Sequence, residues 1–358
     1  MIFQRALIRE FSSLALAVFA TLFAITLTTQ LVRLLGQAAA GQVLSEGVLA
    51  LLGFAALNYL PVLLSLTLFV SVLMALSRSY RDSEMVIWFS SGQSLIAWIR
   101  PVLAFSLPIV VVIAVLSMLL SPWAVGMAEN YRRQMESRDD ASRVTPGVFR
   151  EAGGADRVFF VEGVAGDQTN VQNVFVAQED KGVMSVLVSQ RGFRETAKNG
   201  DRFVVLVNGR RYDGAPGAVD YKMMEFDRYA IRIEIRDPDR IQVSTKATPT
   251  WTLLWDESHG GRAELLWRIG LPVSAFTLAL LAIPLSFVNP RASRSMNLLF
   301  ALLTYMFYSN LVSIVQAWVA QGRLAFGYGW WAVHAAMLVV LILTMWRRVS
   351  FGWAWRRK

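Results

Sequence analysis

The sequence predicts an α-helical polytopic membrane protein in which six transmembrane helices flank an inserted all-β domain, three helices on each side. Of its 358 residues, 55% are hydrophobic and 17% are charged, against about 45–50% and about 25% in soluble domains. Because a helix needs about 20 mainly apolar residues to cross a membrane, six long charge-free runs predict six spans. They are Phe11–Val32, Gly47–Ser77, Pro101–Ala128, Ile269–Pro290, Ser295–Gly322 and Leu324–Trp346.

The middle of the chain is too rich in charge to span a membrane. Between Glu129 and Arg268 the longest charge-free run is Gln168–Gln178, far below the length of a span. We therefore expect three parts: spans 1–3 in residues 1–128, a water-facing domain in residues 129–264, and spans 4–6 with a basic tail in residues 265–358. Residues 122–144 look helical and should extend the third span.

The inserted domain has the pattern of β-structure. Residues Tyr229–Arg236 alternate apolar and charged side chains, which places Ile231, Ile233 and Ile235 on one face of a strand. Short strands separated by Gly, Asn and Asp turn signals are typical of a sandwich, a jelly roll or an open barrel, and the pattern leaves these three open. The other expected strands are Arg157–Val161, Val171–Ala177, Val183–Gln190, Arg202–Asn208 and Asp220–Phe226.

The distribution of basic residues predicts the orientation. With both termini inside, the inner segments hold twelve Lys and Arg, whereas the short outer loops hold only Arg33 and Arg323. Because basic residues stay on the cytoplasmic side, we expect cytoplasmic termini and an inserted domain outside the cytoplasm. The net charge of +9 lies on the inner face, so it indicates attraction to anionic headgroups rather than binding of nucleic acid.

The segment between the second and third spans predicts a coupling element. A helix over about residues 83–99 would begin with Glu84, whose carboxylate suits the helix N-terminus. Its apolar side chains Met85, Trp88 and Phe89, with Val86 and Ile87, cover most of the helix. Such a helix either rests among lipid headgroups or is held by a soluble protein beneath the membrane.

Residues suited to catalysis are scarce. The chain has no Gly-Lys dipeptide and so lacks an ATP-binding phosphate loop. It has no cysteine, and its two histidines, His259 and His334, have no partner at metal-ligand spacing. A packed or interfacial role suits His334 better than a proton relay. We therefore expect no enzyme, no metal and no cofactor, and any energy for transport must come from another chain.

Arg33 is a candidate ligand for phosphate. It lies at the outer end of the first span, on the side where basic residues are disfavoured. One interpretation is that the Arg33 side chain extends its charge to the membrane–water interface and so marks the end of the span. The other is recognition of phosphate, for which the planar guanidinium is well shaped.

Four short stretches, in their order along six spans, resemble a known family. Together with the layout of three spans, a β-domain and three spans, they make essentially the whole chain similar to the lipopolysaccharide export permeases, the LptF/LptG family. The first and last stretches look more like the LptF members than the LptG members. The stretches are Leu31–Gly36, Ser83-Glu84 followed by Gly92, Ala263–Ile269 and Ile283–Arg291.

The resemblance implies a multi-pass protein of the bacterial inner membrane that works in a complex. The implied partners are an LptG-like permease, two cytoplasmic LptB ATPase subunits and LptC, a single-span protein with a periplasmic β-jellyroll. The substrate is lipopolysaccharide, and the inserted domain should be an open periplasmic β-jellyroll. Residues 83–99 become the coupling helix, with Glu84 as its acidic contact.

The resemblance also implies a path for the lipid. The first and fifth spans would line the cavity, with Arg33 at the lipid A phosphates. The other lipid-binding candidates are Tyr305, Phe307 and Tyr308 in the fifth span and, in the β-domain, Val204, Leu206, Ile231, Ile233 and Ile235. Two rival functions remain: a non-transporting scaffold for the β-domain, or the permease of another ATP-driven exporter.

Overall fold

The computed structural model describes most of the chain. The described residues are 2–40, 43–142, 150–151, 157–165, 170–180, 183–196, 202–214, 221–232, 244–287 and 294–354. The chain divides into two compact units, a helical unit formed by Met1–Met135 with Val243–Lys358, and a β unit formed by Glu136–Gln242. Residues 129–135 and 243–264, which the charge pattern groups with the inserted domain, thus belong to the helical unit.

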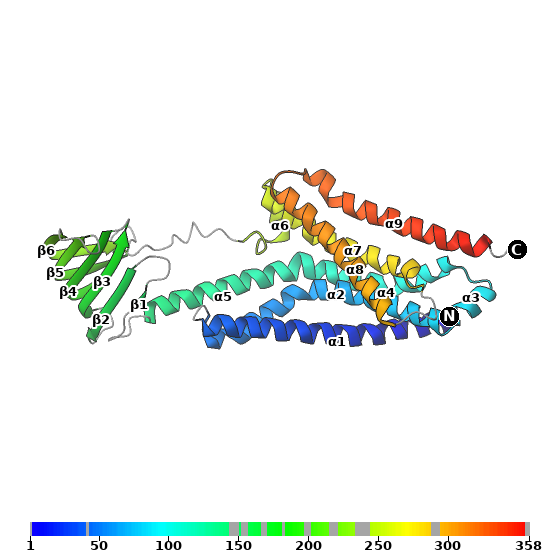
Figure 1. Cartoon of the computed structure of the whole chain (residues 1–358), viewed down its shortest axis with the longest axis horizontal. Helices are drawn as coiled ribbons and strands as arrows, with labels where there is room; N and C mark the ends of the chain where they lie inside the picture. The colour runs from blue at the N-terminus through cyan, green and yellow to red at the C-terminus, as the bar shows by residue number, and fades with distance from the viewer. Residues whose placement is uncertain are drawn as a thin grey trace. The chain divides into compact units, whose positions relative to one another are not determined.

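Among the described residues, six helices of the helical unit are long and apolar enough to cross a membrane, which confirms the predicted number of spans. Figure 1 shows them running alongside one another. They are α1 (Ile2–Ala39), α2 (Val48–Arg81), the third span, α7 (His259–Leu285), α8 (Arg294–Ala320) and α9 (Phe326–Ala354).

The fourth span begins earlier than the charge pattern predicts. The expected start is Ile269, but α7 begins at His259 and contains Glu264 and Arg268. The two charged side chains pair with each other across one turn of the helix, so the helix continues through them. A count of charges cannot detect this, because it treats each charge as if it were unpaired.

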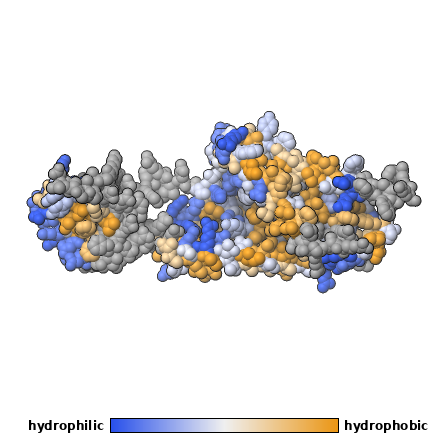
Figure 2. All heavy atoms as spheres, viewed as in Figure 1, coloured by the Kyte–Doolittle hydropathy of each residue, from blue (hydrophilic) through white to orange (hydrophobic). Residues whose placement is uncertain are grey.

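Helices α2 and α7 form the core of the helical unit. In the most apolar window of each, 67% and 72% of the residues are buried, against 6% in α1 and 17% in α8. Helix α7 packs on α2, α8, α9 and α4 (Ile99–Val115), and α1 packs along α2. Apolar side chains also cover much of the visible face of this unit (Figure 2), as expected for a surface in contact with lipid or with other spans.

The third span is one long helix with a wide turn in its middle. It consists of α4 (Ile99–Val115), the π-helical turn η3 (Leu116–Leu120) and α5 (Ser121–Ser142). The helix expected over residues 122–144 is therefore present as far as Ser142. Single π-helical turns are rare in proteins, and those that occur are often found at functional sites.

Short elements connect the spans. Helix α3 (Glu84–Ser90) is followed by a turn, by η2 (Leu95–Trp98) and by α4, so the single helix expected over residues 83–99 is wrong. The chain turns at Gly92, where φ is 91°, and is extended at Ser94. Among the described residues, the other short helices are η1 (Ser45–Gly47), between α1 and α2, and α6 (Thr250–Leu253), which precedes α7.

The β unit contains one antiparallel sheet with the strands in sequential order, visible in Figure 1. This order confirms an inserted β-domain, while the jellyroll stays a prediction. The strands are β1 (Arg150–Glu151), β2 (Arg157–Ala165), β3 (Asn170–Asp180), β4 (Val183–Thr196), β5 (Arg202–Gly214) and β6 (Tyr221–Arg232).

Strand β6 corrects the prediction of two separate strands in this region. The expected strands were 220–226 and 229–236, whereas β6 runs without a break from Tyr221 to Arg232, through Asp227 and Arg228. Asp227 is of a residue type that is common in turns, yet no turn forms there. Arg228 instead forms an ion pair with Glu195 of β4. Of the three isoleucines assigned to one face, Ile231 is described, and Ile233 and Ile235 lie outside the described residues.

Candidate functional site

Glu84, the predicted acidic contact, is bonded within the chain at the start of α3. Its Oε2 accepts a hydrogen bond of 2.9 Å from the hydroxyl of Ser79, and its Oε1 lies 3.5 Å from Nη2 of Arg78. The Glu84 side chain is still 41% exposed. The carboxylate is therefore both oriented by α2 and accessible to a cationic partner.

The predicted apolar contacts of α3 face inward. Met85 is 1% exposed, and Trp88 and Phe89 pack against the same core. These positions have the i, i+3, i+4 spacing that places side chains on one helix face. The exposed side chains are Val86 and Ile87, at 65% and 67%. The same spacing in the sequence separates the two faces of α3, so the helix is not apolar all round in its packing.

Arg33 is exposed near the C-terminal end of α1. Gln37 lies one turn later on the same face, and its Oε1 accepts a hydrogen bond of 3.3 Å from Nη2 of Arg132 in α5. A second guanidinium thus lies close to the next turn of that face. The sequence does not predict this neighbour, because Gln37 and Arg132 are 95 positions apart and no local pattern joins them.

The three aromatic candidates of α8 are divided between two environments. Tyr305 and Tyr308 are buried in the core, at 8% and 0% exposed, whereas Phe307 is 62% exposed. Tyr308 Oη and His334 Nδ1 of α9 lie 2.7 Å apart in a hydrogen bond, so His334 is a packed histidine, as expected. Tyr305 donates to the carbonyl of Val62 at 3.4 Å. Only Phe307 of the three presents its ring at the surface of the unit.

The described candidates in the β-domain gather at one apolar cluster. Leu206 is a fully buried member of it, and Val204 and Ile231 pack against the cluster. Val204 is opposite Ile231 in the register of β5 and β6, so the predicted alternation is correct for these positions. The buried members of this cluster, called the sheet cluster below, are Val174, Val176, Leu187, Leu206 and Phe226.

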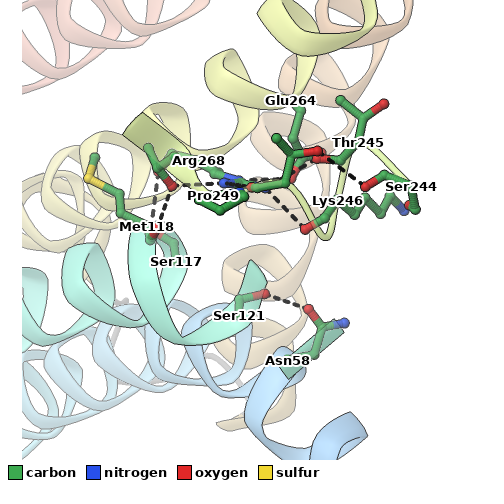
Figure 3. A network of polar contacts seen from close by, with 12 residues as sticks. Asn58, Ser117, Met118, Ser121, Ser244, Thr245, Lys246, Pro249, Glu264 and Arg268 are labelled. Carbon is green, nitrogen blue, oxygen red and sulfur yellow. Dashed lines mark hydrogen bonds and ion pairs between the residues drawn. The ribbon is translucent and has the colours of Figure 1, made fainter. Parts of the chain in front are cut away.

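A buried ionic network in the helical unit was missed by the sequence analysis. Arg268 of α7 is 2% exposed, yet all three of its guanidinium nitrogens donate hydrogen bonds (Figure 3). The acceptors are Glu264 Oε1 at 3.0 Å from Nε, the Thr248 carbonyl at 2.9 Å and Thr250 Oγ1 at 2.8 Å from Nη1, and the carbonyls of Lys246 at 3.1 Å and Thr245 at 3.4 Å from Nη2.

The same network reaches the wide turn of the third span. Thr250 Oγ1 donates to the carbonyl of Met118, and Ser117 Oγ donates to the carbonyl of Arg268 at 3.1 Å. Both Ser117 and Met118 belong to η3. We call these residues the Arg268 network: Ser117, Met118, Thr245, Lys246, Thr248, Thr250, Glu264 and Arg268. The Glu-x-x-x-Arg spacing of residues 264–268 is the signal that could have indicated the pair.

A cavity of about 360 Å³ borders this network. Lys246, Glu264 and Arg268 line one side of it, and Asn58 and Gln316 contribute amides from α2 and α8. Ser121 Oγ donates to Asn58 Oδ1 at 2.5 Å near the same space (Figure 3). The cavity has many polar groups, so it can hold water next to the buried ion pair.

Comparison with known proteins adds the family. A family model described as "Lipopolysaccharide export system permease LptF/LptG" matches residues 5–347. The chain is 29% identical over 361 aligned residues to the lipopolysaccharide export system permease protein LptF of Escherichia coli (strain K12), covering 98% of this chain and 96% of that protein. The same identity and coverage hold for LptF of Shigella flexneri.

Proposed function

The chain belongs to the LptF/LptG family of lipopolysaccharide export permeases, and from this premise we propose that it is the LptF-like permease subunit of an ABC transporter. It would extract lipopolysaccharide from the inner membrane and pass it to a periplasmic bridge toward the outer membrane. The observation that carries the proposal is the extent of the match, residues 5–347, because it includes both groups of helices and the inserted sheet.

We propose that the other parts of the transporter are separate chains. An LptG-like permease would complete the membrane cavity, an LptB dimer would hydrolyse ATP in the cytoplasm, and LptC would continue the periplasmic path. The absence of a Gly-Lys phosphate-loop signature from the sequence supports a separate ATPase. This arrangement has both termini in the cytoplasm and the β unit in the periplasm.

Helix α3 is proposed to dock on the ATPase through Glu84 and the exposed pair Val86 and Ile87. Their exposure supports this choice, since a docking surface must be accessible before the partner binds. The opposite face of α3 would not contact the ATPase directly. Its side chains Met85, Trp88 and Phe89 hold α3 on the core of the helical unit. A push on α3 is then transmitted to α2 and α4.

Helices α1 and α8 are proposed to face the lipid cavity. Both pack on α2, and few residues of their most apolar windows are buried. Arg33 would bind the phosphates of the lipid, and Phe307 would contact its acyl chains. Tyr305 and Tyr308 would support α8 from the core, since their hydroxyls are hydrogen-bonded inside the unit.

The β unit is proposed to be an open jellyroll whose sheet cluster, extended by Val204 and Ile231, touches the acyl chains in transit. An apolar trough with an open edge risks aggregation unless another strand covers that edge. Pairing of the edge with the jellyroll of a neighbouring protein would extend the sheet by backbone hydrogen bonds and continue the trough.

Site-specific photocrosslinking tests this function in the assembled transporter. A photoreactive residue at Val32, beside Arg33, and another at Val204 report the membrane site and the sheet cluster. Val32 is 65% exposed. With lipopolysaccharide-containing vesicles we expect capture at both positions, and capture at Val204 only when ATP is supplied. Val188, an exposed apolar residue of β4 at 45%, is the control and should not capture lipid.

Two results would contradict the proposal. Failure of the chain to co-purify with any ATPase would favour a scaffold. Equal labelling of Val204 and Val188, or labelling at Val204 that ignores ATP, would mean that the lipid does not pass along the sheet cluster.

A further inference from the structure

Arg268 holds the segment through which the chain returns from the strands to the helices. The described chain resumes at Ser244, after β6, and residues 244–250 lead through α6 into α7. The three backbone carbonyls bound by Arg268, at residues 245, 246 and 248, all lie in this segment. One guanidinium therefore fixes the entry of the chain into the helical unit.

The third span is included in this attachment. The hydroxyl of Thr250 accepts from Arg268 and donates to the Met118 carbonyl. A π-helical turn shifts the regular hydrogen-bond pattern of a helix, which frees a backbone carbonyl for an outside donor. The returning segment, α7 and η3 are thus joined by one set of hydrogen bonds (Figure 3).

Stability alone is a poor explanation for this design. Burying an ion pair costs several kcal/mol of desolvation per ion, and well-packed apolar side chains of similar volume are often as stable or more stable. A planar guanidinium with five N–H donors in a fixed fork, however, defines the direction of every group it binds. The network is therefore better suited to fixing the position of the segment than to strengthening the fold.

We propose that Arg268 is a positioning residue that ties the return segment 244–250 to the third and fourth spans, so that movement of these spans during transport is transmitted to the β-domain. The proposal rests on the proposed function, since it assigns Arg268 to the transfer of lipid from the membrane site to the sheet cluster. Glu264 supports Arg268 by holding Nε, and Thr250 extends the contact to η3.

The test compares the two crosslinking positions in variants of the assembled transporter. Arg268→Gln removes the charged fork, and Thr250→Val removes only the hydroxyl that joins Arg268 to η3. The matched controls are Arg262→Gln, an arginine of the same helix that is half exposed, and Thr252→Val, an exposed threonine whose hydroxyl donates to the carbonyl of Pro249.

In both test variants we expect ATP hydrolysis and lipid capture at Val32 to stay at the wild-type level. Capture at Val204 should fall about tenfold or more, because a hydrogen bond to a charged group is worth at least that factor in an equilibrium. Both controls should behave as wild type. Arg268→Lys should resemble Arg268→Gln, since an ammonium has no fork to bind three carbonyls.

A parallel loss at Val32 and Val204 would make Arg268 a residue of general structure and overturn the proposal. Unchanged capture at Val204 in Thr250→Val would overturn the proposed link to η3. If Arg268→Gln does not assemble, the Thr250→Val result by itself tests the proposal. A wild-type transporter that captures no lipid at either position would instead refute the proposed function, so the two failures are distinguishable.

Discussion

Arg78 binds the carboxylate of Glu10 through two nitrogens, with Nε 2.5 Å from Oε1 and Nη2 2.8 Å from Oε2. The same guanidinium lies 3.5 Å from a carboxylate oxygen of Asp82 and of Glu84. One cation therefore connects the start of α1, the end of α2 and the start of α3. On the proposed function, this links the helix that docks on the ATPase to the helix that faces the lipid.

Substitution of Arg78 should uncouple ATP hydrolysis from lipid release. The side chain is 42% exposed, and exposed ion pairs are worth about 0.2–1 kcal/mol. We therefore expect Arg78→Gln to lower the lipid released per ATP hydrolysed by about twofold to fivefold, with normal assembly. Exchange of the charges in Glu10→Arg with Arg78→Glu should restore part of the loss. Arg81→Gln, a neighbouring arginine of α2, is the control, and an equal defect there would contradict the link.

Glu84→Ala should weaken binding of the ATPase. Loss of one partner in a buried charged contact costs about 2–5 kcal/mol, which a pull-down of the complex can detect. Ser79→Ala is the matched control, because it removes the hydrogen bond to Glu84 and keeps the carboxylate. A Glu84→Ala complex with normal stoichiometry and normal lipid-stimulated ATP hydrolysis would remove Glu84 from the docking surface.

Arg33→Glu should reduce capture of lipopolysaccharide at Val32 and slow its release, because a carboxylate repels the phosphates that a guanidinium binds. The complex should still assemble, since Arg33 is exposed. Arg323→Glu serves as the control, because Arg323 is the other basic residue of the short loops that the charge pattern predicts to be outside. Unchanged capture in Arg33→Glu would mean that Arg33 does not bind the lipid phosphates and only marks the end of the span at the membrane interface.

Gly209→Ala should destabilise the β unit. A Cβ at this position would lie 2.5 Å from the ring of Phe226 and from the carbonyl oxygen of Val188, and such overpacking costs about 1–3 kcal/mol. Hydrogen exchange of the backbone amides in β4 to β6 should accelerate, while exchange in α7 stays the same. Asn208→Gly is the comparison, because Asn208 has a φ of 53° that glycine adopts easily. Unchanged amide exchange in Gly209→Ala would mean that the sheet has room for a methyl group between Phe226 and Val188.

Asp213 should make the β unit sensitive to acid. Burial alone would raise the pKa of Asp213, but hydrogen bonds from Ser185 and Arg211 lower it below its usual value of 3.8. A carboxylate whose pKa is lower in the folded state stabilises the fold above its unfolded pKa, and the stabilisation is lost as the pH falls toward the folded pKa. Asp213→Asn should therefore speed amide exchange in β4 and β5 at pH 7, and its effect should shrink when the pH is lowered below the usual pKa of 3.8. An equal effect at both pH values would contradict this origin.

The sequence by itself determined the layout of this protein. Long charge-free runs are visible in a single chain because crossing a membrane places the same demand on every residue of a span. The same holds for the alternation around Val204 and Ile231, since a strand sends successive side chains to opposite faces. The six spans, the inserted β-domain and the family followed from such local patterns and from the order of four short stretches.

The tertiary structure decided which side chains meet. Arg268 looked like a charge at the edge of a span, yet it is buried because Glu264 and three carbonyls from residues 244–250 surround it. Tyr308 and Phe307 are neighbours in sequence, but packing against α9 buries the first and leaves the second exposed. Such contacts join residues far apart along the chain, so no local pattern contains them, and only the packing of the helices fixes them.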